Sequence, residues 1–319
     1  MKPEHKELYQ ALEDVKTDSI RLTALLELAL VFSNENFVEG WKFSNEALLL
    51  ATKLRDEPAR AKSFEGMASA SWKLAEYSMS LEHFADALEI YRAQDDAYGV
   101  ARCFCGMGII CGSVDEFITA LEYFEEGLAA SKEADRPQLT ASITGNIGSV
   151  YFNFGQYRQA MDCFQLGLDY YQDLSLLPGA ANMLSGMAGV HVFLAEYQLG
   201  LDKIEKAIAI HLKANHIVGY AVARMNRGIT LHRMGRITEA EQELLSTLDY
   251  ARSVELKSAE FDILAHLVEF YTELGKPDKI AFYSELHADG ITEAKKQTLK
   301  MKNERLKHRA ILNSYRKTN

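Results

Sequence analysis

The sequence predicts an all-α solenoid in which about seven helical hairpins stack side by side. Three observations predict this fold: the chain repeats its own pattern with a period of about 40 residues and without insertion or deletion, its apolar residues recur at helical spacing, and no alternating apolar run is long enough for a sheet. A single hairpin leaves one apolar face uncovered, and a stacked neighbour covers it. We therefore expect one continuous stack rather than several globules.

Composition and charge set the class of protein. The 319 residues are 48% hydrophobic and 25% charged, with a net charge of −10, as in a soluble globular chain. The longest nearly apolar run, residues 22–32, is about half a membrane span and contains Glu27. The four cysteines form neither a CxxC pair nor a zinc-ligand spacing. We expect a cytoplasmic protein without a membrane span, metal or cofactor, and the acidic charge argues against a nucleic-acid partner.

The first element covers residues 1–17. Residues 4–16 read EHKELYQALEDVK, which is compatible with a helical half-unit. We expect residues 1–17 to form a helix that caps the first repeat.

The repeat itself covers residues 18–290 and is clearest in residues 146–168, NIGSVYFNFGQYRQAMDCFQLGL. In that unit we expect a first helix to about Phe154, a turn at Gly155 and Gln156, and a second helix from Tyr157 to about Asp173. One column of the repeat, taken in steps of 40, holds mostly the small residues needed where two helices nearly touch: Leu28, Ala68, Gly108, Gly148, Ala188, Gly228 and Val268.

At these positions the chain resembles the tetratricopeptide repeat family, whose unit carries a small residue with Tyr, Gly-x-Tyr-x-x-Ala, Phe and Ala-Leu in this order. The stretch GSVYFNFGQYRQAMDCFQLGL matches nearly every position. A unit of about 40 residues is longer than the family's minimal unit of about 34 residues, which indicates a long-helix variety. HEAT-type repeats share the period, but the small-residue columns favour the first family. The resemblance implies a right-handed α-α superhelix whose concave groove is lined by first helices.

The resemblance also implies which side chains face that groove. They are amides, a few cations and aromatic rings, a set suited to an extended peptide. Asn146 and Asn226 recur at the same place in their units, where a side-chain amide can pair with peptide main chain. The full set of candidates is Lys62, Trp72, Lys73, Arg102, Ser142, Asn146, Phe152, Asn153, Asn182, Val192, Phe193, Asn226, His232 and Arg233. One branch of the family binds chaperone tails with Lys and Asn at two particular inward positions. This sequence does not have that set of residues at those positions.

Arg224 and Arg227 break the repeat pattern, and residues that break a local rule are candidate functional sites. The equivalent positions in other units hold core residues, namely Phe64, Phe104 and Leu184 for the first and Met67, Met107, Ile147 and Met187 for the second. Two interpretations stay open. Either both guanidinium groups extend to solvent or pair with carboxylates of an adjacent helix, such as Glu205 or Glu241, or they form an anion site.

The last element, residues 291–319, is basic and compatible with a helix, because it holds nine Lys or Arg and two Glu. One interpretation is a capping helix over the last repeat. Another is a connector to an output domain, as in the sensory arrays of bacterial histidine kinases and nucleotide cyclases. A third is a tail that docks on anionic lipid or nucleic acid.

No pattern in the chain is typical of catalysis: there is no nucleophile elbow, phosphate-binding glycine loop or HExxH motif. We expect a protein without enzymatic activity, an adaptor or scaffold that binds a peptide or partner protein in its groove. The alternative is a sensory or regulatory module of a bacterial signalling protein, a kinase or cyclase, whose output domain is absent from this chain. The sequence determines neither the partner nor the oligomeric state.

Overall fold

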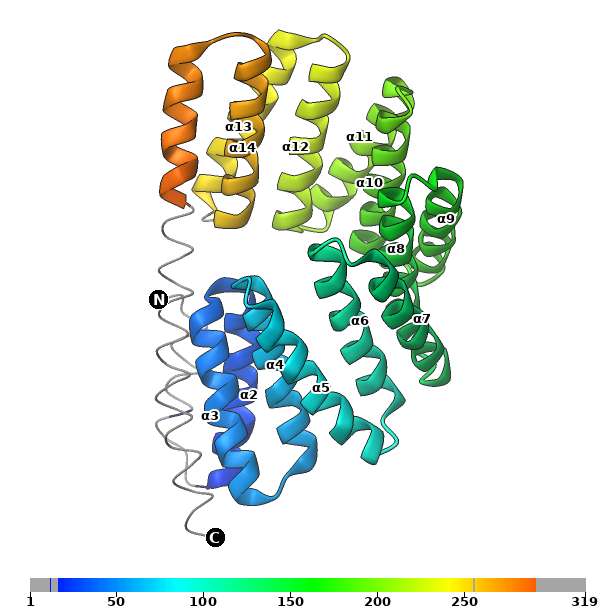
Figure 1. The fold of residues 1–319 in the computed structure, drawn as a ribbon, viewed down its shortest axis with the longest axis vertical. Helices are drawn as coiled ribbons and strands as arrows, with labels where there is room; N and C mark the ends of the chain where they lie inside the picture. Colours follow the sequence, from blue (N-terminus) through cyan, green and yellow to red (C-terminus); the bar gives the residue numbers. More distant parts are fainter. Residues whose placement is uncertain (1–11, 13–16, 255, 291–319) are drawn as a thin grey trace. The chain divides into compact units, whose positions relative to one another are not determined.

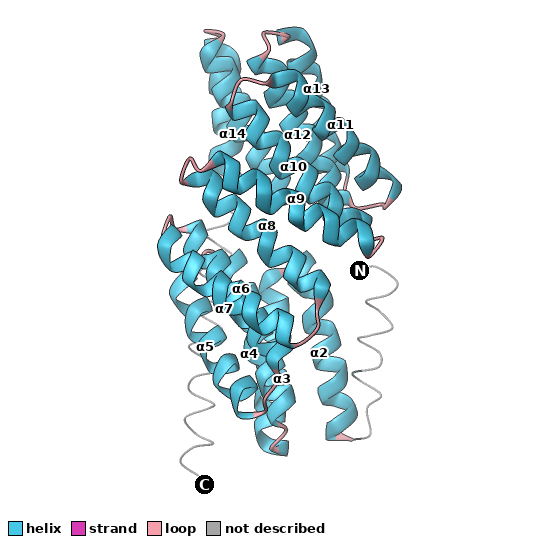
Figure 2. Cartoon of the chain, turned by 90° about the vertical axis from the view of Figure 1, so that its right-hand side faces the viewer, coloured by secondary structure: helices cyan, strands magenta, loops and turns pink. Residues whose placement is uncertain are grey.

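The computed structural model describes residues 12, 17–254 and 256–290. Short turns join α-helices throughout this part of the chain, and none of its residues forms a strand (Figure 2). The helices are α2 (Asp18–Glu35), α3 (Phe37–Leu54), α4 (Glu57–Lys73), α5 (Tyr77–Ala93), α6 (Ala97–Ser113), α7 (Phe117–Glu133), α8 (Pro137–Asn153), α9 (Tyr157–Asp173), α10 (Leu177–Phe193), α11 (Tyr197–Lys213), α12 (Ile217–Arg233), α13 (Ile237–Ser253) and α14 (Lys257–Glu273). Residues 277–290 are also helical. Consecutive helices pair into the seven hairpins that the repeat predicts (Figure 1).

Two compact units divide the chain. The first holds α2 to α7, and the second holds α8 to α14 and the helix over residues 277–290. Within each unit, helices that follow one another in sequence also pack against one another. A continuous stack across the boundary between the units stays a prediction. The elements predicted at 1–17 and 291–319 lie outside the described residues, except for Leu12, which packs against the buried cluster of α2 and α3, and Thr17, which caps α2.

The first helices of the hairpins form the tighter row of each unit. In the second unit α8 contacts α10, α10 contacts α12, and α12 contacts α14. Among the described residues the second helices α9, α11 and α13 make no such contacts with one another. Because the first helices stand closer together, each unit curves toward them. We call the exposed side of the first helices the first-helix surface.

The turns explain the regularity of the repeat. From α4 to α14 every helix has 17 residues, so a helix and the short turn after it take half of a repeat unit. From α4 onward, each three-residue turn whose middle residue the structure describes has a left-handed backbone at that residue, as at Gly155 with φ 73°. The amide of Gln156 then donates to the carbonyl of Tyr151 over 2.8 Å and closes α8. The predicted turn is confirmed, and α8 ends one residue earlier than expected.

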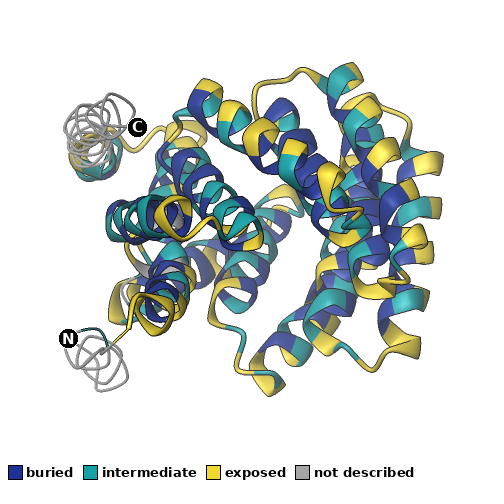
Figure 3. Cartoon of the chain, turned by 90° about the horizontal axis from the view of Figure 1, so that it is seen from below, coloured by how far each residue is buried: buried dark blue, intermediate teal, exposed yellow. Residues whose placement is uncertain are grey.

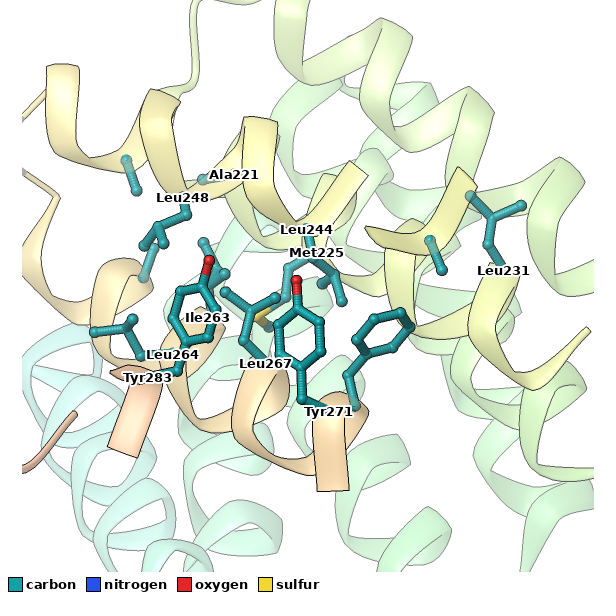
Figure 4. Close-up of a cluster of buried hydrophobic side chains, with 14 of the residues drawn as sticks. Ala221, Met225, Leu231, Leu244, Leu248, Ile263, Leu264, Leu267, Tyr271 and Tyr283 are labelled. Atoms are coloured by element: carbon teal, nitrogen blue, oxygen red, sulfur yellow. The ribbon is translucent and has the colours of Figure 1, made fainter. Parts of the chain in front are cut away.

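The predicted small-residue column lies where two helices of a hairpin touch. A Cβ atom on Gly108 would stand 2.6 Å from a ring carbon of Phe124, and one on Gly148 would stand 3.0 Å from a ring carbon of Phe164. The small residue lets the ring of the second helix reach the backbone of the first. Buried residues therefore lie on the helix faces turned toward neighbouring helices (Figure 3). The cluster of α12 to α14 shows this packing, with Leu244 and Tyr271 almost fully buried (Figure 4).

Candidate functional site

Three aromatic rings meet at one end of the first helices in the second unit. Phe152 is the last residue but one of α8, Tyr157 begins α9 and Phe193 ends α10. The centroid of the Phe193 ring lies 4.8 Å from that of Tyr157 and 5.8 Å from that of Phe152. Phe193 is nevertheless 62% exposed. These three residues form what we call the aromatic platform, and Phe152 and Phe193 are both residues that the sequence predicted to face inward.

The helices beside the platform carry no charge. Neither α8 nor α10 contains Asp, Glu, Lys or Arg, although these make up 25% of the chain. On α10 the exposed residues Asn182, Gly189 and Phe193 share one side of the helix, because they are seven and four residues apart. A Cβ atom on Gly189 would meet nothing within 4 Å, so packing does not require a glycine there. Glycine inside a helix costs about 1 kcal/mol relative to alanine.

The remaining predicted amides follow the same surface. On α8, Asn153 is exposed and Asn146 is half-buried. On α12, Asn226 is half-buried, and Arg233 is exposed at the end of the helix. His232 lies with its ring 4.7 Å from that of Phe270. The second unit thus brings together amides, two exposed or half-exposed phenylalanines and one cation along its first helices.

In the first unit, Arg102 is held within the fold. Its Nε donates to Oε1 of Glu65 over 2.7 Å, and its Nη2 donates to Oε2 over 2.9 Å. Tyr91 donates from Oη to the same carboxylate over 2.9 Å, and burial together with Glu65 raises the pKa of Tyr91. The guanidinium also lies over the ring of Tyr98 at 4.3 Å. This network joins α4, α5 and α6, so Arg102 connects helices.

The other candidates of the first unit lie on α4. Lys62 is exposed, whereas Trp72 and Lys73 are half-buried. Trp72 donates from Nε1 to Oγ of Ser113 over 3.4 Å. Lys73 donates from Nζ to the carbonyl of Ser33 over 2.7 Å, and burial lowers its pKa. Lys73 therefore ties α4 to the end of α2.

Arg224 and Arg227 meet at one buried carboxylate, that of Glu243. Arg224 donates from Nε to Oε1 of Glu243 and from Nη2 to Oγ of Ser246, each over 2.7 Å. Arg227 donates from Nη2 to the other carboxylate oxygen. Glu243 is 7% exposed. Burial alone raises its pKa, but the hydrogen bonds from the two guanidinium groups outweigh burial and hold the pKa below its usual range.

The carboxylate differs from the two that the sequence suggested. Glu241 accepts a hydrogen bond from Oη of Tyr271 over 2.7 Å, and Glu205 is exposed. Sequence reasoning named Glu241 on α13 and missed Glu243 two residues later, because the choice between them depends on which side of α13 is turned toward Arg224. The repeat contains the signal: Phe64 with His83, and Phe104 with Tyr123, are ring pairs at the same two columns, each with centroids 6.1 Å apart.

A pocket of about 400 Å³ lies at this ion pair. The helices α11, α12 and α13 supply its walls. Its lining consists of Leu201, Glu205, Arg224, Arg227, Leu231, Arg236, Glu239, Gln242, Glu243 and Ser246. Most of these side chains are charged, so the pocket suits a polar ligand.

Two family models described as tetratricopeptide repeat match the chain, one over residues 60–133 and one over residues 141–174. Together with the stacked hairpins, these matches decide the family. The chain belongs to the tetratricopeptide repeat family. Its units are longer than the family's minimal unit, which makes it a long-helix member. Among curated proteins, none matches this tetratricopeptide repeat chain.

Solved structures share the fold of this tetratricopeptide repeat chain at low sequence identity. A Rap protein complexed with competence and sporulation factor matches with a TM-score of 0.76 and 16% identity, over 93% of this chain and 82% of that one. The Rap conjugation gene regulator of plasmid pLS20, in complex with the Phr* peptide, matches with a TM-score of 0.70 and 16% identity, over 89% and 76%. NprR in complex with its cognate peptide NprX matches with a TM-score of 0.64 and 14% identity, over 90% of this chain and 84% of that one.

The residues that the structure describes contain neither a cluster of metal-ligand side chains nor a helix suited to cross a membrane. No three His, Cys, Asp or Glu side chains there group closely enough to hold a metal ion. No helix in that part of the tetratricopeptide repeat chain has both the length and the apolar character that a bilayer crossing needs. The cytoplasmic location stays a prediction.

Proposed function

We propose that this protein binds an extended peptide, free or as a segment of a partner protein, on the first-helix surface of its second unit. The observation that carries the proposal is the aromatic platform, in which Phe193 remains 62% exposed beside two uncharged helices. Burying an aromatic ring removes apolar area from water at about 25 cal/mol per Å². An apolar side chain of the peptide that covers Phe193 therefore supplies a favourable anchor.

The amides and the bare helix backbone suit the main chain of the same peptide. A side-chain amide both donates and accepts hydrogen bonds, so Asn182 and Asn146 can pair with peptide N–H and C=O groups. Gly189 lies between Asn182 and Phe193 on the exposed side of α10, and it lets the peptide backbone approach closely. Because α8 and α10 lack charged side chains, the segment above them is uncharged. Arg233 on α12 then meets an acidic group beyond it.

The structures of similar fold support this proposal. The Rap protein is complexed with competence and sporulation factor, and the pLS20 regulator and NprR are each in complex with a peptide. The proposal requires binding alone, and no side chain is assigned a catalytic role.

A random library of 12-residue peptides selected against the intact chain tests the proposal. We expect the selected peptides to share a bulky apolar residue. Synthetic copies should bind the wild-type protein and lose at least tenfold in affinity against F193S, because the anchor is removed. Asn182→Ala and Asn146→Ala should each weaken binding less, by about threefold to tenfold. The matched control is I118S on α7, which removes an apolar side chain that is 69% exposed on a second helix.

Binding that is equal in wild type and F193S contradicts the proposal, as does a library that yields no binder above background. Phe193 is largely exposed, so F193S should leave the unfolding temperature within about 2 °C of wild type. That measurement separates lost binding from lost folding.

A regulatory role is a second proposal, favoured by one observation: a structure of similar fold is described as a conjugation gene regulator in complex with a peptide. In a regulator the peptide must change the protein's conformation. Small-angle scattering of the intact chain, with and without a selected peptide, separates the two proposals. A change in the radius of gyration supports a regulator, and an unchanged radius supports an adaptor.

A further inference from the structure

The pocket around Glu243 lies on the far side of α12 from the peptide surface. At 100° per residue, Asn226 and Arg233 stand about 200° and 180° around the helix from Arg224. Its other walls belong to the second helices α11 and α13. A ligand in this pocket therefore leaves the first-helix surface free.

Stability does not explain the charges at this place. Replacing a buried ion pair with well-packed apolar residues is often neutral or stabilising. The preceding unit of this chain holds the apolar residues Leu184 and Met187 at the positions of Arg224 and Arg227, and a half-exposed Lys203 at the position of Glu243. Leu184 and Met187 belong to a buried apolar cluster there. The unit with Arg224 and Arg227 therefore has a polar pocket at a place where the preceding unit has an apolar core.

At Arg224, Arg227 and Glu243 the pocket has more positive than negative charge, and it has hydrogen-bond donors without an acceptor in the part of the chain that the structure describes. Two guanidinium groups share the single carboxylate of Glu243, which leaves one net positive charge. Nε of Arg227 is buried and has no hydrogen-bond partner among the described residues. The side chain of Arg227 is nevertheless 31% exposed. Because Nε is buried, a ligand in the pocket can meet Arg227 only at its Nη groups, which can hold a carboxylate in two-point contact.

The rim of the pocket limits which anion fits. Arg236 is already paired with Glu239 through two hydrogen bonds of 2.8 and 2.6 Å. Glu205 is exposed at the rim and forms no ion pair with any described residue. The lining as a whole is neutral, since it holds three Arg and three Glu. A phosphate would add nearly two negative charges beside two rim carboxylates, whereas a carboxylate adds one.

We propose that this pocket binds a small molecule through a carboxylate group, which Arg224 and Arg227 hold, with the hydroxyl of Ser246 and the amide of Gln242 beside them. Its volume of about 400 Å³ lies within the range of small-ligand sites. The ligand's carboxylate supplies the second negative charge that the two guanidinium groups lack.

Titrations with propionate, butyrate and inorganic phosphate, at constant ionic strength and pH 7, test the proposal. The readout is the NMR signals of the arginine Nε–H groups, assigned with single Arg→Lys variants. We expect propionate and butyrate to shift the signals of Arg224 and Arg227 saturably, with dissociation constants in the millimolar range, and phosphate to bind at least tenfold more weakly. Absence of a saturable shift with either carboxylate overturns the proposal, and so does phosphate binding more tightly than both.

Two variants sharpen the test. E243Q removes the internal carboxylate, so an added carboxylate takes its place, and we expect its dissociation constant to fall at least tenfold. The matched control is E126Q, which changes the net charge equally on an exposed position of α7 and should bind as wild type does. Equal affinity in E243Q and E126Q overturns the proposal, because binding then follows net charge and not this site.

The triple variant R224L/R227M/E243K places the residues of the preceding unit into the pocket. We expect it to fold with an unfolding temperature at least equal to that of wild type and to lose the saturable response. If it retains the response, the ligand binds elsewhere and the proposal is wrong. If it folds but is strongly destabilised, the charged trio serves the fold, and the functional assignment is overturned.

Discussion

The ring of Tyr171 on α9 lies against Gly179 on α10, where a Cβ atom would stand 2.3 Å from the ring carbon Cε1. The same pairing occurs two repeat units earlier and one unit later along the chain, with Tyr91 against Gly99 and His211 against Gly219. Two other units hold small residues at both positions, Ala51 with Ala59 and Ala251 with Ala259. Within each of these pairs a large residue faces glycine and a small one faces alanine, so the two side chains together fill the contact between one hairpin and the next.

Gly179→Ala should destabilise the protein by about 1–2 kcal/mol, because the clash with Tyr171 exceeds the gain in helix propensity. Tyr171→Ala should cost about 3 kcal/mol through the cavity it leaves. The double variant restores the small pair of the other units, so its cost should be smaller than the sum of the two. Urea unfolding of the four proteins, followed by circular dichroism, measures this coupling. Additive effects would contradict it.

The left-handed turn positions allow a test of backbone strain alone. Gly235 has φ 75°, and a Cβ atom there would meet nothing within 4 Å. Gly235→Ala should therefore cost about 1 kcal/mol, purely because an L-residue is disfavoured in this conformation. Ala75 occupies the same turn position with φ 58°, so Ala75→Gly should stabilise the protein by about 0.5–1 kcal/mol. Unfolding midpoints of both variants should move in opposite directions, and shifts in the same direction would argue against strain.

His211 makes stability depend on pH. Its side chain is buried, and its Nδ1 lies 3.2 Å from Nδ1 of His216, which also accepts the amide hydrogen of Gly219 over 3.2 Å. Burial and the neighbouring His216 lower the pKa of His211 from 6.5 to about 4. The unfolded chain therefore takes up this proton near pH 6.5, whereas the folded protein does so only near pH 4. The neutral His211 therefore makes its full contribution to the free energy of unfolding above pH 6.5, and this contribution is lost as the pH falls toward 4.

The expected loss from this residue is about 2 kcal/mol between pH 8 and pH 5. H211Y introduces the residue found at Tyr91 and Tyr171 and keeps a ring against Gly219, so it should remove this part of the pH dependence. Urea unfolding of both proteins at pH 8, 6.5 and 5 measures the difference. Parallel losses in wild type and H211Y would show that other groups cause the acid sensitivity.

Arg102 was a groove candidate, and its contacts with Glu65 indicate a role in the fold. Arg102→Met should cost about 1–2 kcal/mol, since both side chains remain about a quarter exposed and solvent weakens the pair. The variant R102M/E65Q should recover part of that loss, because no carboxylate is then left without its cation. Affinity for a peptide selected on the wild-type protein should be unchanged in R102M. A tenfold loss of affinity in R102M at unchanged stability would show that Arg102 does contact the peptide.

Much of the fold could be predicted because it depends on local, periodic features. The turn at Gly155, the starts of α8 and α10 beside Pro137 and Pro178, and the small residue at Gly108 each repeat at fixed spacing. Part of the candidate site could be predicted for the same reason, since Phe152 and Phe193 occupy adjacent columns near the ends of α8 and α10. Their meeting with Tyr157 in one platform required the packing of three helices.

The sequence by itself determined the helix lengths, the turn positions and the order of the hairpins, because each depends on residues within one repeat unit. Only the tertiary structure decided that Arg102 forms an ion pair with Glu65, while Asn182 and Phe193 remain exposed. It also decided that Glu243, and not Glu205 or Glu241, receives both arginines. These outcomes depend on how far a side chain reaches across to a neighbouring helix, and the packing of the hairpins sets that distance.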